Sequence, residues 1–262
     1  MTPMTTYPAA RRQKPDRDQA ANAAEAEGDA ILAVLRRIGD HWQQPTDCVG
    51  WSVRDITAHL VGQAEDLASL FTVTRRIRHG RRHFPDRIEL DALTAQQIAD
   101  HTEDSGPQLV TAFATAWPRA LRSVRRMPAV IRNRTIRPGI PDPPRWTIGY
   151  LQDIIYSRDL WMHRVDLCRA TDQPMVFDDH DRWIVNEVIR DLAASWTGPA
   201  VTLELTGPAG DKFQLGDSAP TGHVRADAVD FLRGLSGRPV DHALAARNAP
   251  AVRALQTARV TF

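Results

Sequence analysis

Three side chains in this sequence have the types and the spacing of a metal centre. Asp159 and His163 are four residues apart in a segment with helical periodicity, so they stand one above the other on the same helix face. His59 lies in a second helical segment, beside the apolar positions Ile56 and Leu60. A buried carboxylate costs several kcal/mol unless it is paired or bound to a cation. His59, Asp159 and His163 are therefore candidate ligands of one divalent metal.

The donor set indicates which metal and which kind of site to expect. Two imidazoles and one carboxylate favour zinc over iron or nickel, and three protein ligands leave a coordination position open, as in a catalytic site. Asp166 could accept the ring hydrogen of a ligand histidine. Simpler interpretations stay open: Asp159 and His163 as an ordinary helix ion pair, His59 as a core histidine, and Asp166 as an exposed partner of Arg164 or Arg169. For Asp166 we favour the exposed ion pair.

Four long helices are predicted to position these residues. Ser52, followed three residues later by Asp55, is a relative of the capping box and marks the start of the second helix. Pro118 should kink or divide the third. Residues 81–106 are polar and irregular, with a short helix predicted within residues 94–104. By apolar periodicity, the four helices cover residues 18–42, 53–78, 107–127 and 147–171, the last with Ile148, Leu151, Ile155 and Met162 on its buried face.

The two ends of the chain differ from this helical region. Residues 1–17 contain three prolines and no apolar periodicity, which predicts a disordered tail. After Pro174 the pattern changes. Two helices are predicted, at 178–196 and 228–237. Short alternating runs typical of strands lie at 201–207, 211–216 and 223–227, and a last strand is predicted at 258–262. The predicted fold class is α+β, with a helical domain at 18–173 and a small mixed domain at 174–262.

Composition excludes several classes of protein. The formal net charge is +1, so no general attraction to nucleic acid is expected. There is no apolar run of about 20 residues, as a membrane helix requires. Two cysteines, Cys48 and Cys168, are too few for a disulfide framework and fit a reducing, cytoplasmic location. Lys14 and Lys212 are the only lysines among many arginines, which indicates a GC-rich, actinobacterial type of source.

Two segments of the sequence resemble the signatures of a known family. PTDCVGWSVRDITAHL, ending at Leu60, and SRDLWMHRVDLCRATDQP, which contains both Asp159 and His163, resemble the signatures of the mycothiol-dependent maleylpyruvate isomerase family. The region from VTLELTGPAGDKFQLG to FLRGLSGRP resembles its small C-terminal domain. The resemblance implies a DinB-like four-helix metal-binding bundle. By position it implies the same three ligands, with Asp159 in place of a usual glutamate, and an arginine near the metal at Arg238.

The resemblance also implies a reaction. A divalent metal, in our expectation zinc, would activate mycothiol or a similar thiol for isomerisation of, or S-transfer to, a small electrophile, and Arg238 would hold a substrate carboxylate. The expected partners are these small molecules, with no nucleic acid and no membrane, and the protein is expected to be a monomer or a homodimer. The alternatives are a DinB-like protein that binds a metal or ligand without turnover, and a helical scaffold without metal.

Overall fold

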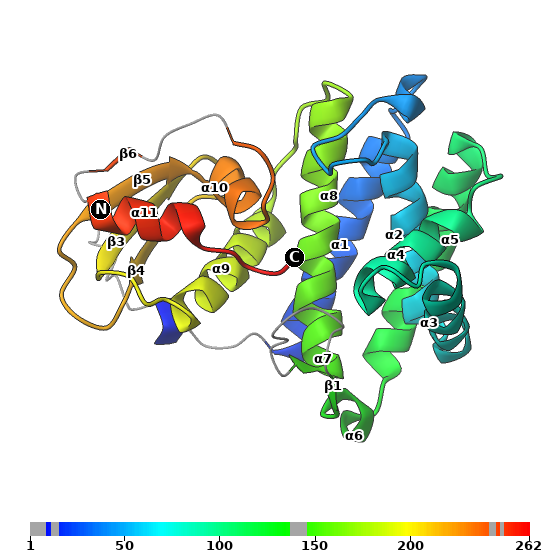
Figure 1. Ribbon diagram of the computed structural model, residues 1–262, viewed down its shortest axis with the longest axis horizontal. Helices are drawn as coiled ribbons and strands as arrows, with labels where there is room; N and C mark the ends of the chain where they lie inside the picture. The colour runs from blue at the N-terminus through cyan, green and yellow to red at the C-terminus, as the bar shows by residue number, and fades with distance from the viewer. Residues whose placement is uncertain (1–8, 12–15, 137–145, 241–244, 247–248) are drawn as a thin grey trace. The chain divides into compact units, whose positions relative to one another are not determined.

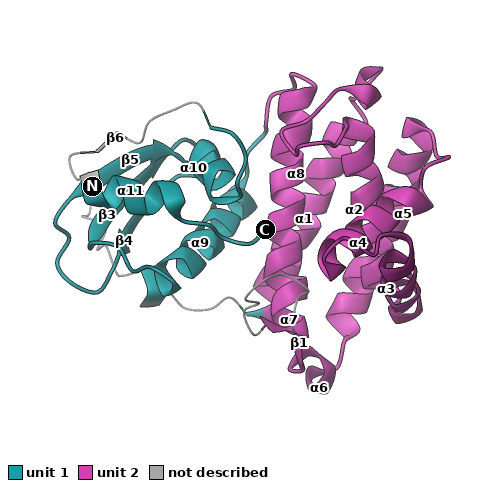
Figure 2. Cartoon of the chain, in the orientation of Figure 1, with its two compact units in different colours: residues 1–16, 176–262 teal, residues 17–175 magenta. Residues whose placement is uncertain are grey.

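The computed structural model describes residues 9–11, 16–136, 146–240, 245–246 and 249–262. The chain divides into two compact units, one of Arg17–Met175 and the other of Met1–Asp16 together with Val176–Phe262 (Figures 1 and 2). The first unit is helical and the second is mixed, which confirms the predicted α+β class with a helical bundle before a small mixed region. Among the described residues, no helix is long and apolar enough to cross a membrane.

Four helices form the core of the first unit: α1 (Arg17–Leu35), α2 (Val53–Ala68), α5 (Gly106–Arg126) and α8 (Tyr156–Ala170). Helix α2 packs along α5, and α1 packs against both α5 and α8 (Figure 1). Burying one large aliphatic side chain contributes roughly 1.5–3 kcal/mol, so these contacts hold the bundle together. The fully buried side chains of this core include Ile31, Leu35, Ile56, Leu60, Leu109, Phe113 and Leu160.

The start of α2 is as predicted, but its end is not. Ser52 and Asp55 form a capping box, in which the Asp55 backbone N–H donates to the Ser52 hydroxyl and the Ser52 N–H donates to the Asp55 carboxylate. The predicted continuation to residue 78 is wrong. Ser69 adopts an extended conformation (φ −147°, ψ 112°) and its hydroxyl caps a new helix, α3 (Leu70–His83). Leu70, the first residue after this break, is 66% exposed.

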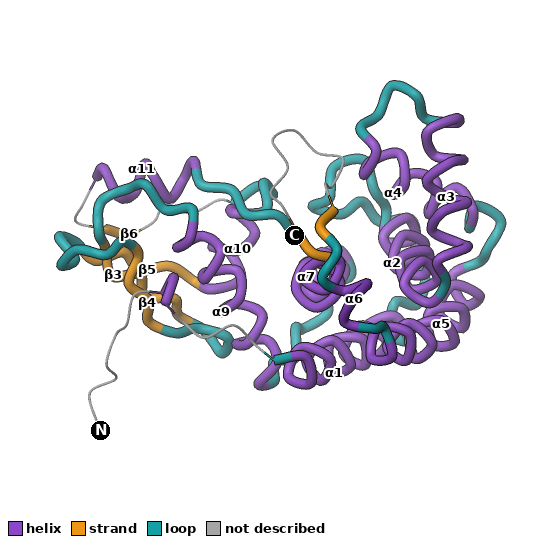
Figure 3. Tube along the Cα trace, turned by 90° about the horizontal axis from the view of Figure 1, so that it is seen from below, coloured by secondary structure: helices purple, strands orange, loops and turns teal. Residues whose placement is uncertain are grey.

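Helix α4 (Glu89–Asp100) begins five residues before the short helix predicted at 94–104. It pairs with α3, and both pack against α2 (Figure 3). Arg76 of α3 is buried between these helices and forms ion pairs with Asp66 of α2 and Asp100 of α4. These buried ion pairs therefore hold α3 and α4 against α2, in a region where the sequence showed no regular apolar pattern.

The end of α4 carries a histidine that is expected to make stability depend on pH. His101 contacts Glu65 at 3.3 Å and Asp104 at 2.8 Å. Burial lowers the pKa of His101, but the hydrogen bonds to Glu65 and Asp104 outweigh it and raise the pKa above 6.5. Because the folded pKa is raised, this stabilisation is complete below pH 6.5 and is lost as pH rises through the folded pKa.

We therefore expect His101→Gln to reduce the free energy of unfolding by up to about 1 kcal/mol near pH 6, with the difference shrinking at alkaline pH. Glu65 has a pKa lowered from 4.5: burial raises it, but the hydrogen bond to His101 and the contacts with Arg76 outweigh this effect, so it remains charged near pH 6. Urea titrations across pH measure this difference, with the exposed His41→Gln as control. A difference that stays constant with pH would contradict the charged contact.

Pro118 does not divide α5, which is continuous from Gly106 to Arg126. A proline removes one helical hydrogen bond. The flanking Trp117 and Leu121 are buried in the bundle core, and this packing keeps the chain helical on both sides. Of the two predicted effects of Pro118, a kink or a division, the division is therefore wrong.

The fourth predicted helix consists of three consecutive segments: α7 (Ile148–Tyr150), a π-helical segment η3 (Leu151–Ile155) and α8. A π-helical turn contains an extra residue, so the face that is buried before it is not the face that is buried after it. Accordingly Ile148 and Leu151 are half-buried, whereas Ile155 and Met162 are buried. Short elements connect the bundle helices: η2 (His41–Gln43), α6 (Ala129–Arg132), β1 (Thr135–Ile136) and β2 (Trp146–Thr147).

The second unit contains a four-stranded sheet of order β4-β3-β5-β6. Strand β3 is antiparallel to β4 and parallel to β5, and β5 is antiparallel to β6. Alternate residues of β3, namely Val201, Leu203 and Leu205, are buried, as the alternating pattern predicts. The elements are η1 (Ala9–Arg11), α9 (Asp179–Ala194), β3 (Val201–Thr206), β4 (Lys212–Leu215), β5 (His223–Asp227), α10 (Ala228–Leu235), β6 (Ala245–Ala246) and α11 (Ala249–Thr257).

Two predictions for the chain ends need correction. Residues 258–262 do not form a strand; they follow α11, and the Val260 N–H donates to the Leu235 carbonyl. Within the predicted disordered tail, Ala9–Arg11 form a 3-10 turn that packs on α9 and β4, with Ala9 fully buried. A small apolar side chain between a helix and a sheet gives no periodic signal. The tail residues 1–8 and 12–15 lie outside the described part of the chain.

Candidate metal centre

Helices α2 and α8 bring the three predicted ligands together inside the bundle. His59 Nε2 lies 3.1 Å from Asp159 Oδ2, and His163 Nε2 lies 3.4 Å from Asp159 Oδ1. One ligand atom from each of the three residues lies within 4.8 Å of the other two. Both histidines are buried, and the Asp159 side chain is 19% exposed. The site is thus enclosed, with its carboxylate reachable from solvent.

Hydrogen bonds at the far side of each imidazole fix its orientation. His59 Nδ1 lies 2.7 Å from Gln97 Oε1, and His163 Nδ1 lies 3.1 Å from Asp166 Oδ2. An amide oxygen and a carboxylate oxygen are acceptors, so each Nδ1 donates a hydrogen. Both Nε2 atoms, which face Asp159, are then available to a metal. This is the arrangement by which hydrogen-bond partners orient metal-ligating histidines.

Asp166 is fully buried, so the exposed ion pair with Arg164 or Arg169 that we favoured from the sequence is wrong. The alternative, in which Asp166 accepts the ring hydrogen of a candidate ligand, describes its contact with His163. The sequence could not distinguish an exposed ion pair from a contact with His163, because Asp166 lies among alternating charged and apolar residues. Only the packing of α8 on all sides buries it.

The electrostatics of the centre favour a charged carboxylate. Burial raises the pKa of Asp159, but the charges of His163 and His59 outweigh this effect and hold the pKa well below its usual range. Burial lowers the pKa of His163, but Asp159 and the hydrogen bond to Asp166 raise it to about 9. Without a metal, a proton on His163 balances the carboxylate. A metal at the Nε2 position would replace that proton.

Two further side chains complete the site, and the sequence analysis gave neither of them a role there. Gln63, one helical turn after His59, is buried and donates its amide hydrogen to Asp159 Oδ2 at 2.6 Å. Trp51 stacks on the His163 ring, with centroids 5.7 Å apart and planes 18° apart, and lies 5.3 Å from the His59 ring. The i, i+4 spacing of His59 and Gln63 was a usable signal.

The donors fit a divalent metal of the zinc type. Zinc binds histidine nitrogen and carboxylate oxygen at about 2.0–2.2 Å with tetrahedral geometry, which places neighbouring donors roughly 3.3–3.6 Å apart. The observed separations of 3.1 and 3.4 Å are close to this value. Two Nε2 atoms, each with its Nδ1 already hydrogen-bonded, and one anionic carboxylate match the ligand chemistry of zinc.

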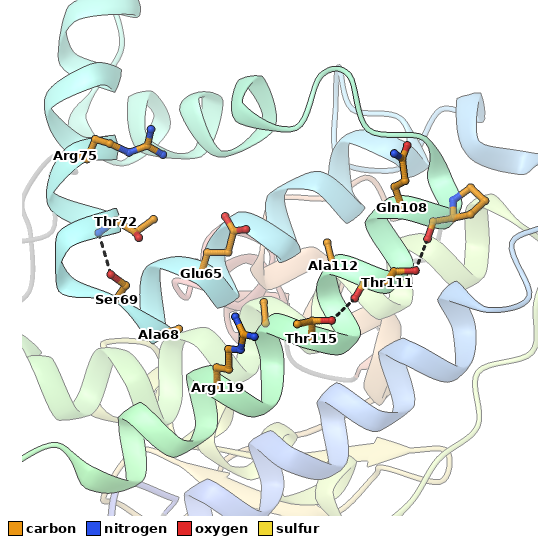
Figure 4. A pocket seen from close by; sticks show the side chains of 12 residues that line it. Glu65, Ala68, Ser69, Thr72, Arg75, Gln108, Thr111, Ala112, Thr115 and Arg119 are labelled. Carbon is orange, nitrogen blue, oxygen red and sulfur yellow. Dashed lines mark hydrogen bonds between the residues drawn. The ribbon is translucent and has the colours of Figure 1, made fainter.

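A groove of about 790 Å³ lies elsewhere on the bundle, between the α2–α3 junction and α5 (Figure 4). Its polar side chains include Glu65 and Thr72 on one side and Gln108 and Thr111 on the other. None of the three candidate ligands lines it. We therefore assign this groove no part in metal binding.

Arg238, the predicted substrate-binding residue, belongs to the second unit. It follows α10, where its backbone N–H donates to the Arg233 carbonyl and its guanidinium donates to the Ser236 hydroxyl at 3.1 Å. The three candidate ligands, Gln63 and Trp51 all belong to the bundle. Its role stays a prediction.

Comparison with known proteins identifies the family. Residues 8–168 match the family described as "Mycothiol maleylpyruvate isomerase N-terminal domain". A solved structure titled "Crystal structure of the mycothiol-dependent maleylpyruvate isomerase" aligns with 93% of this chain and 96% of its own, at 16% identity and a TM-score of 0.59. A histidine-to-alanine mutant of that enzyme aligns over the same shares at 15% identity and a TM-score of 0.59. The comparison with curated proteins found no significant match. Because the family match covers more than half of the sequence, the chain belongs to the mycothiol maleylpyruvate isomerase family.

Proposed function

We propose that this protein is an enzyme that uses one divalent metal, zinc by preference, to activate mycothiol or a similar thiol. The activated thiol acts on a small electrophile, by isomerisation or by S-transfer. The observation that carries the proposal is the convergence of His59, Asp159 and His163, with both Nδ1 atoms hydrogen-bonded and both Nε2 atoms directed at one carboxylate. The family match and the fold shared with a mycothiol-dependent isomerase support the same thiol.

The buried cysteine of the bundle does not supply the reactive thiol. Cys168 is buried, and burial raises the pKa of its thiol to about 11, so it is a poor nucleophile at neutral pH. A free thiol has a pKa of about 8.5, and a divalent metal stabilises the thiolate of a thiol bound to it. Around the metal, Gln63 holds the Asp159 carboxylate and Trp51 covers the histidine rings.

The proposed reactions share their first step. The thiolate adds to an activated alkene, a C–S bond forms, and the carbon–carbon double bond becomes a single bond. In an isomerisation the adduct rotates about that bond, the C–S bond breaks and the thiolate leaves. In an S-transfer the C–S bond remains and the carbanion takes a proton. Arg238 would hold a substrate carboxylate in either reaction.

A second candidate function is metal or ligand binding without turnover. The observation that favours it is Asp159 itself. The family resemblance places a glutamate at this position, and aspartate is one methylene shorter, so its carboxylate must approach the metal more closely. A change of this kind can preserve binding while it removes catalysis.

The test combines elemental analysis with an assay of thiol-dependent turnover. Wild type is compared with the double variant His59→Ala, His163→Ala, and with a control double variant of two exposed histidines, His41→Ala and His223→Ala. Mycothiol is offered with a panel of electrophiles that includes maleylpyruvate. Mass spectrometry separates isomerisation, which conserves the thiol, from S-transfer, which consumes it.

We expect about one zinc per chain in the wild type and in the control, and none in the ligand variant, with turnover lost at the same time. Stoichiometric metal without turnover on any electrophile would favour the binding protein. Wild-type protein that takes up no metal even after reloading would contradict the metal centre and leave a helical scaffold.

A further inference from the structure

A chain of buried polar contacts leads from His59 to helix α3. His59 Nδ1 contacts Gln97 Oε1 at 2.7 Å, and the other end of the same amide, Gln97 Nε2, donates to Asp66 Oδ2 at 2.7 Å. Asp66 Oδ1 in turn accepts from Arg76 Nη1 at 2.9 Å. None of these four side chains is more than 7% exposed. The contacts therefore form in a low-dielectric interior, where hydrogen bonds are strong and unpaired groups are costly.

Arg76 pairs directly with the Asp66 carboxylate. A guanidinium can only donate, and that of Arg76 contacts Asp66, Asp100 and the Gly62 carbonyl. Burial raises the pKa of Asp66 above its usual value, and the charge of Arg76 and the hydrogen bonds from Gln97 and Arg76 offset only part of this effect. The carboxylate of Asp66 thus has a fixed cation beside one oxygen and the Gln97 amide beside the other.

The charge on Asp66 decides which way the Gln97 amide points. A carboxylate can only accept, so the NH₂ end of Gln97 must face Asp66 and the oxygen must face His59. An oxygen at that place can only accept, so it favours a hydrogen on Nδ1 of His59. Nε2 faces the Asp159 carboxylate, which also accepts, so a metal at Nε2 would take the place of a hydrogen there, and the Nδ1 hydrogen bond to Gln97 would remain. Reversing the amide would direct an N–H at Nδ1 and favour the wrong tautomer.

We propose that Asp66, held by Arg76, is a positioning residue that sets the tautomer of His59 through Gln97. This inference rests on the proposed metal centre, because the tautomer matters only if Nε2 binds a metal. Sequence gives no hint of it, since Asp66 and Arg76 lie on different helices and Gln97 lies in a segment without a clear pattern.

The chain offers two pairs of matched variants. Asp66→Asn keeps size and removes the requirement that Gln97 donate, because an asparagine can donate or accept. Its control is Asp100→Asn, which also removes a carboxylate from Arg76 but does not touch Gln97. Gln97→Met removes the amide. Its control is Gln96→Met, a neighbouring buried glutamine that contacts His83 and Asp100 instead.

Zinc affinity is measured by chelator competition, and the tautomer of His59 by long-range ¹H–¹⁵N NMR of the metal-free protein at mildly alkaline pH. Loss of the hydrogen-bond partner of a metal-ligating histidine typically lowers metal affinity 10–100-fold. We therefore expect Gln97→Met to weaken zinc binding by about that factor and Asp66→Asn by about 10-fold. The two controls should stay within about threefold of wild type. Asp66→Asn should also show a larger share of the Nε2–H form than the wild type, because the Gln97 amide is then free to reverse.

Wild-type zinc affinity and a wild-type share of the two tautomers in Asp66→Asn would overturn the proposal. An equal loss of affinity in all four variants would also overturn it, because that result would indicate a purely structural effect. If the wild type itself failed to bind zinc, the proposed function would fall, whereas the His59 tautomer would still decide the positioning role. The two failures are thus distinguishable.

Discussion

Glu27→Ala is expected to lower the free energy of unfolding by about 3–5 kcal/mol, because it removes one partner of a buried ion pair. Glu27 of α1 accepts two hydrogen bonds from Arg164 of α8, at 2.7 Å from Nε and 2.8 Å from Nη2. The two side chains are 0% and 1% exposed.

Urea unfolding followed by circular dichroism measures this loss. Glu25→Ala is the matched control, because Glu25 is on the same helix and pairs with Arg125 at 2.7 Å, but its side chain is 51% exposed. An exposed pair contributes about 1 kcal/mol or less. The double variant Glu27→Leu, Arg164→Met should recover much of the loss, since apolar replacement of both partners of a buried pair is often neutral. Equal small effects of Glu27→Ala and Glu25→Ala would contradict the buried pair.

Asp159→Asn is expected to weaken zinc binding by more than about 100-fold, beyond the loss typical of residues that only support a ligand. The substitution preserves size but removes the negative charge that both histidines face at 3.1 and 3.4 Å. It also replaces an anionic oxygen ligand with a neutral amide, which binds zinc poorly.

Chelator competition and elemental analysis measure the effect. Asp172→Asn is the control, because Asp172 follows α8 at a positive φ of 51°, a conformation that asparagine adopts readily. It should bind zinc as the wild type does. Zinc affinity of Asp159→Asn within threefold of wild type would show that the carboxylate is not a ligand, and the centre would then need a different third donor.

Local sequence patterns were sufficient where the determining interactions are local. Apolar spacing of three and four residues predicted the four bundle helices, because a helix must bury one continuous face. The Ser52 and Asp55 capping box involves residues three apart, and the alternation in residues 201–207 requires only a strand with one buried face. The i, i+4 spacing of Asp159 and His163 placed them together on one face of α8 for the same reason.

The interactions that the sequence left open depend on residues far apart in the chain. Gln97 contacts His59 across 38 positions, and its role depends on the pairing of α4 with α2. Asp166 is buried rather than exposed because α8 is packed on all sides, which no pattern within α8 reports. The same holds for α5, which stays helical through Pro118 because Trp117 and Leu121 are buried in the core.

The sequence by itself therefore determined the class of fold, the family and three candidate metal ligands, since residue type and short-range spacing define these features. Only the tertiary structure decided the orientation of these side chains, because Gln63, Gln97, Asp166 and Trp51 act through contacts made on packing. The amino-acid sequence specifies which ligand atoms are present, whereas the direction in which each ligand atom points depends on the residues packed around it.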